Sequence, residues 1–438
     1  MDQSGALTVK EVAAFLRITP QAVYNMIRRE EIPAFKVGSA VRLLRADLNE
    51  YIERGKRLFA AQNAAYEAPA EGIIAARRLC ARFGGGRTAS AFSLDAVSFE
   101  IPVGSTLGIV GPSGSGKTLL LKALAGLVPL EAGALFLGKR RLDGSDPRER
   151  RTGLVFQDYA LYPMLDGAGN IAFPLRVGKA AKETIDPAVE RIAAELGIDR
   201  DFLARQIEAL PEGIKQLVAI GRAENKPAGR DVELFLMDEP LIHLDARMRE
   251  DTRAFLKRLV ASIGATTIYA FNEAADALAL SDRLLVLRDG RVAQFGTTDE
   301  VFRRPADVNV MELLSLNGVT ALTGAYAAGT VDLAAGAEVA AVPGTGTAPD
   351  YRGKVVVGFR PEETESARSG AKGALTATID RSVPYDGERV LAHGRLIPKG
   401  KKEAPEEASA VSFLAPTEAE GRHTFRPTAA VAFAIMEG

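Results

Sequence analysis

The residues best suited to chemistry form one short run of glycines and small polar residues that ends in a lysine and a threonine. The run consists of Gly111, Pro112, Ser113, Gly114, Ser115, Gly116, Lys117 and Thr118. It lies between the apolar stretches 107–110 and 119–121, as expected for a turn between a strand and a helix. Such a turn directs backbone N–H groups and a helix N-terminus at phosphates. We expect Lys117 to reach the β- and γ-phosphates of a nucleoside triphosphate and Thr118 to hold Mg²⁺.

The composition limits the classes of protein to which this chain can belong. With 438 residues the chain has room for about two to four domains, and its net charge of −1 gives no general attraction to nucleic acid or anionic membrane. Cys80 is the sole cysteine, which excludes an internal disulfide framework. No apolar run approaches the length of a membrane span, and no signal peptide is recognisable. We therefore expect an intracellular protein that reaches a membrane only through a partner.

The first part of the chain carries start signals for two helices. Thr8 and Glu11 have the spacing of a capping box, in which each side chain accepts a hydrogen bond from the other residue's backbone. Thr19 followed by Pro20 gives a second start, with the hydroxyl as cap and the proline in the first turn. Apolar residues at helical spacing follow both signals, so we expect a helix after each.

A small hairpin and a closing helix are expected next. Residues 35–44 alternate about Gly38, and 47–52 have a helical pattern. The Ala-rich stretch 57–70 predicts a short helical extension that runs into a linker. This order of elements resembles the winged helix-turn-helix of excisionase-type DNA-binding domains, in the sequence LTVKEVAAFLRITPQAVYNMIRREEIPAFKVG.

The resemblance implies that the second helix enters a DNA major groove. The residues that would face the bases are Gln21, Tyr24, Asn25 and Arg28, and those near phosphates are Lys36 and Arg42 of the hairpin. The segment is only mildly basic, although positive charge supplies most non-specific affinity for DNA. The alternative is a module of the same fold that docks a protein.

From residue 73 to about 304 the order of motifs resembles the ATPase subunits of ABC transporters. By this resemblance Phe83 stacks on adenine, with Phe92 as the alternative, and either could instead be a core residue. Gln157 corresponds to the glutamine that touches Mg²⁺ and couples the site to the membrane partner. The stretch 159–175 corresponds to the surface on which a transmembrane permease subunit docks.

The same resemblance assigns the acidic residues after the next apolar stretch. Asp238 and Glu239 end the stretch 233–237 in the Walker B pattern. Asp238 is expected to hold Mg²⁺ through water, and Glu239 to polarise the water that attacks the phosphate. Asp245 corresponds to the loop that contacts the opposite subunit of a dimer.

Two motifs of that family are damaged in this chain. Where the family has the signature LSGGQ, the chain has Leu210, Pro211, Glu212, Gly213 and Ile214. The proline removes one N–H group and the serine hydroxyl that would cap a γ-phosphate, and Glu212 brings a negative charge near it. Asn272 stands in the position of the switch histidine, and an asparagine cannot take up a proton.

These losses predict slow ATP hydrolysis and pairing with a second, different ATPase subunit. Subunits of the family pair head to tail, so each ATP lies between one phosphate loop and the signature of the other subunit. A homodimer of this chain would have two poor signatures, whereas a heterodimer with an intact ATPase would have one good one. We favour the heterodimer. The alternative function is an ATP-responsive DNA-binding transcription regulator that uses the degenerate ATPase domain as a sensor.

The C-terminal part resembles the accessory domain of maltose-type importers. Its signs are the segment DEVFRRPADVNVMELL and the run of Arg360, Pro361 and Glu362 after an apolar stretch. Short alternating runs at 375–379, 390–396 and 411–414 predict an OB-like β-barrel. The resemblance favours sugars, polyols, polyamines or oxyanions as cargo, delivered by a solute-binding protein.

Together these signals predict a multidomain chain. We expect a winged helix-turn-helix at 1–58, a linker at 59–72, an α/β P-loop ATPase domain with a helical subdomain at 73–304, and an OB-like domain at 305–438. The expected ligands are ATP and Mg²⁺. The expected location is the cytoplasmic face of the cell membrane, with permease subunits and a second ATPase as partners.

Overall fold

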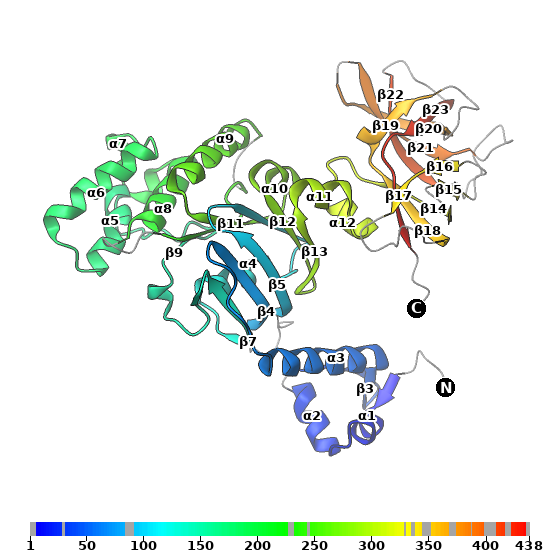
Figure 1. The fold of residues 1–438 in the computed structure, drawn as a ribbon, viewed down its shortest axis with the longest axis horizontal. Helices are drawn as coiled ribbons and strands as arrows, with labels where there is room; N and C mark the ends of the chain where they lie inside the picture. Colours follow the sequence, from blue (N-terminus) through cyan, green and yellow to red (C-terminus); the bar gives the residue numbers. More distant parts are fainter. Residues whose placement is uncertain are drawn as a thin grey trace. The chain divides into compact units, whose positions relative to one another are not determined.

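A computed structural model of the chain describes residues 6–28, 31–83, 92–226, 232–242, 246–327, 330–333, 338–343, 352–367, 374–386, 388–397, 409–416 and 422–434. The chain divides into two compact units, residues 1–272 with 279–292, and residues 273–278 with 293–438. Figure 1 labels most of the helices and strands of both. None of the described helices has the length and apolarity needed to cross a membrane.

The first unit begins with a helix-turn-helix module, which we define as residues 6–62. Its elements are β1 (Ala6–Thr8), α1 (Val9–Leu16), α2 (Pro20–Arg28), β2 (Phe35–Val37), β3 (Ala40–Leu44) and α3 (Arg45–Gln62). The strands form an antiparallel sheet of order β1-β3-β2. Val12, Val23, Leu43 and Leu48 meet in a buried core that joins the helices to the sheet. The predicted order of helices and hairpin is confirmed.

Both helix starts of the module form as the sequence predicts. The backbone N–H of Glu11 donates to Thr8 Oγ1 over 3.1 Å, and the N–H of Thr8 donates to Glu11 Oε2 over 2.7 Å, which completes the capping box. At the second start, the N–H of Ala22 donates to Thr19 Oγ1 over 3.2 Å. Gly38 turns the hairpin with a φ of 62°, a left-handed conformation that glycine adopts without strain.

Helix α3 joins the closing helix that the pattern at 47–52 predicts to the helical extension predicted from residue 57. It runs without a break from Arg45 to Gln62 and so takes up the first residues of the stretch 59–72 that the sequence suggested as a linker. Its second half packs against β4, β5 and β7, the strands that follow in the chain. These tertiary contacts bury Ala61 and therefore stabilise a helical stretch whose own hydrophobic pattern is weak.

The nucleotide domain of the first unit is built on two sheets. The central sheet has the order β13-β12-β6-β11-β10-β9, with parallel pairing from β12 to β9. Its strands are β6 (Thr106–Val110), β9 (Thr152–Val155), β10 (Leu234–Asp238), β11 (Thr266–Phe271), β12 (Arg283–Arg288) and β13 (Arg291–Thr297). Every residue of β10 and β11 is buried, as expected where both faces of a parallel sheet are covered.

The second sheet of this domain is antiparallel and has the order β5-β4-β7-β8. Its strands are β4 (Ile73–Phe83), β5 (Phe92–Pro102), β7 (Leu130–Leu137) and β8 (Arg140–Arg141). Helix α4 (Lys117–Ala125) packs on β10 and β11 of the central sheet and on β4 and β5 of this one. The helix that follows the glycine-rich turn is thus held between two sheets.

A group of helices follows β9, in agreement with the predicted helical subdomain. Its members are α5 (Gly167–Val177), α6 (Lys182–Glu195), α7 (Arg200–Leu203) and α8 (Glu212–Glu224). Helix α5 packs against α6, α7 and α8, while α8 also contacts β9. Two further helices, α9 (Ala246–Ile263) and α10 (Ala274–Leu280), alternate with the last strands of the central sheet.

The second unit is rich in β-structure, as predicted. After α11 (Thr298–Arg303) and α12 (Val308–Leu313), its strands form sheets of order β16-β15-β14-β18-β24-β17 and β19-β23-β20-β21-β22. The bounds are β14 (Thr320–Ala327), β15 (Thr330–Leu333), β16 (Glu338–Ala340), β17 (Val342–Pro343), β18 (Gly353–Phe359), β19 (Thr364–Ser366), β20 (Leu375–Pro384), β21 (Arg389–Leu396), β22 (Ala410–Pro416), β23 (Arg422–Pro427) and β24 (Val431–Ala434). One hydrophobic core, which includes Val357, Phe359 and Phe413, contains residues of both sheets.

Arg360 of the predicted RPE element is fully buried in this unit. Its guanidinium lies 3.9 Å from the ring centroid of Phe302, donates to the Phe302 carbonyl over 2.9 Å and pairs with Glu363 over 3.1 Å. A buried charge is stable only when it is paired and hydrogen-bonded. Arg360 therefore ties α11 to the sheets.

Candidate nucleotide site

The glycine-rich turn connects the buried strand β6 to α4, as the sequence predicts. Gly116 has a φ of 104° and ends the turn as the N-cap of α4, a conformation that other residues adopt only with strain. A Cβ atom on Gly111 would lie 2.1 Å from the carbonyl oxygen of Leu287. The backbone of this turn is therefore shaped by positions that only glycine can occupy.

Lys117 is the first residue of α4 and is almost fully buried. Its Nζ donates to the carbonyl of Gly111 over 2.8 Å and to that of Pro112 over 3.2 Å, so the ammonium lies across the turn. Burial lowers the pKa of Lys117, while the carboxylates of Glu239 and Asp238 favour its charged form. This places a cation where the turn would surround phosphates.

Thr118 and Asp238 bring the expected magnesium ligands together from different elements. Asp238 is the last residue of β10, and its Oδ1 accepts a hydrogen bond from Thr118 Oγ1 over 3.2 Å. Burial raises the pKa of Asp238, although this hydrogen bond and the charges of Lys122 and Lys117 oppose the shift. Hydroxyl and carboxylate oxygens suit Mg²⁺, so the donor set fits the expected ion.

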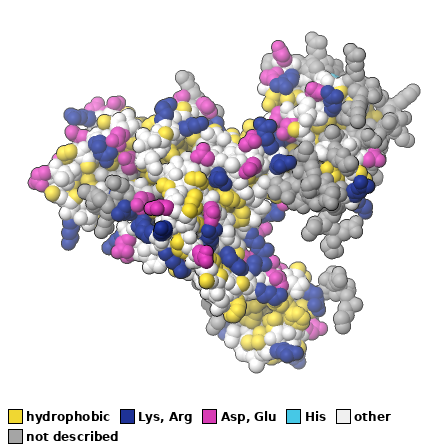
Figure 2. Space-filling model, viewed as in Figure 1, with side chains coloured by type: hydrophobic (Ala, Val, Ile, Leu, Met, Phe, Trp, Pro, Cys, Tyr) yellow, Lys and Arg dark blue, Asp and Glu magenta, His cyan; other side chains and the backbone are white. Residues whose placement is uncertain are grey.

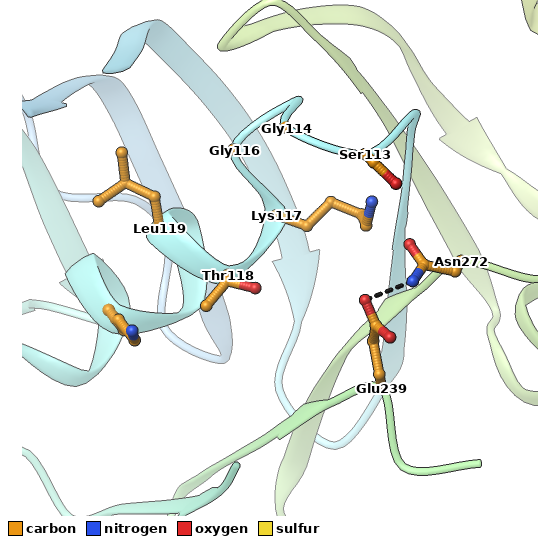
Figure 3. A pocket seen from close by; sticks show the side chains of 9 residues that line it. Ser113, Gly114, Gly116, Lys117, Thr118, Leu119, Glu239 and Asn272 are labelled. Atoms are coloured by element: carbon orange, nitrogen blue, oxygen red, sulfur yellow. Dashed lines mark hydrogen bonds between the residues drawn. The ribbon is translucent and has the colours of Figure 1, made fainter. Parts of the chain in front are cut away.

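Glu239 and Asn272 meet opposite the turn, as Figure 3 shows. Asn272 Nδ2 donates to Glu239 Oε1 over 2.5 Å, and Glu239 has a left-handed φ of 50°. They border a cavity of about 330 Å³ whose other lining residues are Ser113, Gly114, Gly116, Lys117, Thr118, Leu119 and Lys122. The structure thus brings together, in one cavity, residues from three predicted motifs.

Other predicted residues lie outside the cavity or outside the described residues. Gln157 is exposed in the turn after β9 and does not line the cavity. The backbone of Phe83 pairs with that of Phe92 between β4 and β5, but their side chains are outside the described part. Asp245 is also outside it. Ser115 is buried beside Gly111.

Two basic residues that the sequence analysis missed support the site. Lys122 lines the cavity, and its spacing of one helical turn from Thr118 could have revealed it. Arg150 is buried and donates to the carbonyls of Ala123 over 3.0 Å and Leu124 over 2.9 Å. It donates hydrogen bonds to carbonyl groups at the C-terminal end of α4, which have no partner within the helix. No local sequence pattern predicts a partner this far along the chain.

The altered signature forms the start of α8. Pro211 is the N-cap of this helix and offers no side-chain hydrogen bond to it, and Glu212 pairs with Lys215 over 2.7 Å. Of this segment, Leu210 is buried, Pro211 and Glu212 are exposed, and Gly213 and Ile214 are half-buried. None of these residues lines the cavity of its own chain. The charge of Glu212 is therefore partly balanced by a neighbour on the same turn.

The predicted docking stretch is tied to the signature helix. Arg222 of α8 donates to the carbonyls of Ala160 over 2.6 Å and Tyr159 over 2.7 Å, two residues with left-handed φ values of 46° and 59°. Arg222 also lies 5.4 Å from the ring centroid of Tyr162. These contacts join α8 to the start of the stretch 159–175.

The helix-turn-helix module presents most of its predicted contact residues to solvent. Gln21, Tyr24 and Arg28 of α2 are exposed, and Gln21 Nε2 donates to Asn25 Oδ1 over 3.3 Å. Lys36 of β2 is also exposed, whereas Arg42 is half-buried and donates to the carbonyl of Val41. Phe15 and Val37 add exposed apolar side chains, and Figure 2 shows hydrophobic and basic residues together on the module.

Comparison with known proteins identifies both parts of the first unit. The family described as ABC transporter matches residues 94–242, and the helix-turn-helix domain family matches residues 6–56. Among solved structures, the chain is similar to the dimeric bacterial ABC transporter cassette MJ0796, with 25% identity, a TM-score of 0.45, and coverage of 51% of this chain and 98% of that one.

Curated relatives match about two thirds of the chain. The sn-glycerol-3-phosphate import ATP-binding protein UgpC of Ruegeria pomeroyi is 37% identical over 300 residues, which are 68% of this chain and 81% of that protein. The Fe(3+) ions import ATP-binding protein FbpC of Fusobacterium nucleatum is 33% identical over 291 residues, 66% of this chain and 76% of that protein.

Proposed function

Because the chain belongs to the family of ATP-binding subunits of ABC importers, we propose that it binds ATP with Mg²⁺ at the glycine-rich turn and couples binding and slow hydrolysis to solute uptake. The observation that carries the proposal is the cavity in which Lys117, Thr118, Glu239 and Asn272 converge. Their positive, hydroxyl, carboxylate and amide groups match the parts of a triphosphate site.

Four residues of the cavity, together with the adjacent Asp238, have defined tasks in this proposal. Lys117 and the N-terminus of α4 bind the phosphates, and Thr118 with Asp238 would hold Mg²⁺, which would neutralise charge on the phosphates. Glu239 accepts a hydrogen bond from the attacking water and orients it. Asn272 fixes one carboxylate oxygen of Glu239. Since the Asn272 amide cannot take up a further proton as a histidine would, hydrolysis is expected to be slow.

The altered signature supports pairing with a second, intact ATPase. A γ-phosphate capped by this segment would lose the hydroxyl and one N–H group and would face Glu212. A heterodimer would confine that loss to one of its sites, and closing on ATP would drive permease subunits between their two states.

The proposal is tested by purifying the full-length tagged chain from its native membrane with its partners and determining their copy numbers. We expect permease subunits and one copy of a second ATPase, and ATP binding by the complex. Two copies of this chain as the only ATPase of an active transporter would contradict the heterodimer. Failure of the complex to bind ATP would contradict the function itself.

DNA binding by the module is a second candidate function, which the exposed residues of α2 favour. We expect the full-length chain to shift double-stranded DNA in a salt-dependent way, because phosphate contacts release counterions. Arg28→Ala should weaken the shift, while Lys10→Ala on α1 serves as the control. No shift at low salt would leave the module as a protein-docking unit.

A further inference from the structure

Helix α3 lies against the antiparallel sheet of the nucleotide domain through a small apolar contact. Leu58 and Ala61 pack with Cys80, Ala96 and Ala132, and Ala61 is 1% exposed. Beyond this contact Gln62 Nε2 donates to the carbonyl of Glu131 over 3.4 Å. The module is therefore joined to the sheet by packing as well as by the chain.

A charged cluster completes this contact at Asp95 of β5. Arg57 Nε lies 3.0 Å and 2.9 Å from the two carboxylate oxygens of Asp95, and Arg291 Nε lies 2.9 Å from one of them. Glu50 pairs with both arginines. The Asp95 side chain is 5% exposed. Burial would raise the pKa of Asp95, but the hydrogen bonds from the two arginines outweigh it and lower that pKa.

The backbone of Asp95 leads from this cluster to the phosphate loop. Its N–H donates to the carbonyl of Gly290 over 2.8 Å, and the N–H of Gly290 donates to the carbonyl of Ser115 over 3.0 Å. A Cβ on Gly290 would lie 1.9 Å from the carbonyl oxygen of Ser93, so this turn is fitted closely to β5. Two hydrogen bonds thus connect Asp95 to the loop expected to hold phosphates.

We propose that Arg57 of the helix-turn-helix module is a positioning residue for the nucleotide site, acting through Asp95 and Gly290 on the phosphate loop. The inference rests on the proposed ATP site and adds a residue that comes from outside the ATPase domain. Arg57 neutralises and orients Asp95, and the strand then holds the Gly290 turn against Ser115. Because coupling between sites is reciprocal, ATP on the loop also strengthens the seating of α3.

A purely structural anchor would not need this arrangement. The apolar contact around Ala61 already joins α3 to the sheet, and the partly buried Arg57–Asp95 pair has a desolvation cost. Of the described contacts of α3 with the sheet, the Arg57–Asp95 pair is the one that continues by hydrogen bonds into the phosphate loop. This pair can therefore couple the position of α3 to the conformation of the phosphate loop.

The test compares Arg57→Gln with Lys56→Gln in the full-length chain. Lys56 is the adjacent cation on α3, and among the described residues it pairs only with the exposed Glu53. Its substitution by glutamine removes the same charge as Arg57→Gln does. We expect Arg57→Gln to raise the Kd for ATP about tenfold and Lys56→Gln to leave it unchanged. Hydrogen exchange supplies the reciprocal measurement, since ATP should slow exchange in α3 of the wild type and not of Arg57→Gln.

Two further variants test the same path from α3 to the phosphate loop. Glu50→Gln alters an exposed member of the cluster and should raise the Kd in the same direction but less. In an Asp95→Asn background, Arg57→Gln should have no further effect on the Kd. Wild-type affinity in a folded Arg57→Gln chain would overturn the inference. A wild-type chain that does not bind ATP would instead overturn the proposed function.

Discussion

The residues proposed to bind phosphates, which we call the phosphate-binding half, and the proposed signature at 210–214, which we call the signature half, are held very differently in this chain. Lys117 and Asp238 are buried and contact groups of their own chain, whereas Pro211 and Glu212 are exposed at the start of α8. Residues with partners inside the fold are constrained by the fold itself. Residues that would face another subunit are not, so the signature could change without damage to the remaining structure.

The largest effect is expected from breaking the phosphate-binding half with Lys117→Ala. Loss of about two charge-assisted hydrogen bonds of about 2 kcal/mol each should raise the Kd for ATP about 1000-fold. Titration calorimetry on the full-length chain measures this. Lys257→Ala, at an exposed position of α9, is the control and should bind as the wild type does. Retention of wild-type affinity by Lys117→Ala would remove the basis for the site.

Glu239→Gln should separate binding from hydrolysis within the same half. Without the carboxylate the attacking water loses its hydrogen-bond acceptor, so the steady-state rate of phosphate release should fall about 100-fold. The Kd for ATP should change little, because Glu239 does not contact the phosphates in the proposed mechanism. Equal losses of rate and of affinity would show that Glu239 has a structural role instead.

Restoring the signature half should sharpen the contrast. In the triple variant Pro211→Ser, Glu212→Gly and Ile214→Gln, the hydroxyl and the missing N–H group return. We expect ATP-dependent self-association of the chain, visible in sedimentation, and about tenfold faster hydrolysis, since each hydrogen bond contributes about 1 kcal/mol. If the variant self-associates and its rate of hydrolysis does not change, Asn272 and not the signature limits the rate of hydrolysis.

The smallest effect is expected from Glu212→Gln alone. This change removes an exposed ion pair with Lys215 within one helical turn, which contributes less than about 1 kcal/mol. The free energy of unfolding, from denaturant titration, should therefore stay within about 0.5 kcal/mol of the wild type. A loss of several kcal/mol would mean that the signature half is as tightly held as the phosphate-binding half.

Much of the site could be predicted because its signals are local. The spacing of Gly111 to Thr118 predicts a phosphate loop, and the adjacent Asp238 and Glu239 at a strand end predict an acidic pair beside it. What spacing does not show is that Asn272 would hydrogen-bond Glu239. That contact depends on the order of strands in the central sheet, which brings distant segments to one edge.

The sequence by itself determined the elements whose causes lie within a few residues. Thr8 with Glu11, Thr19 before Pro20, and Gly38 start helices or turn the chain through short-range hydrogen bonds and backbone freedom, and all form as expected. Only the tertiary structure decided that residues 45–62 form one unbroken helix and that Arg57 reaches Asp95. Burial against a sheet from another part of the chain supplies the energy for both, and no local pattern contains that contact.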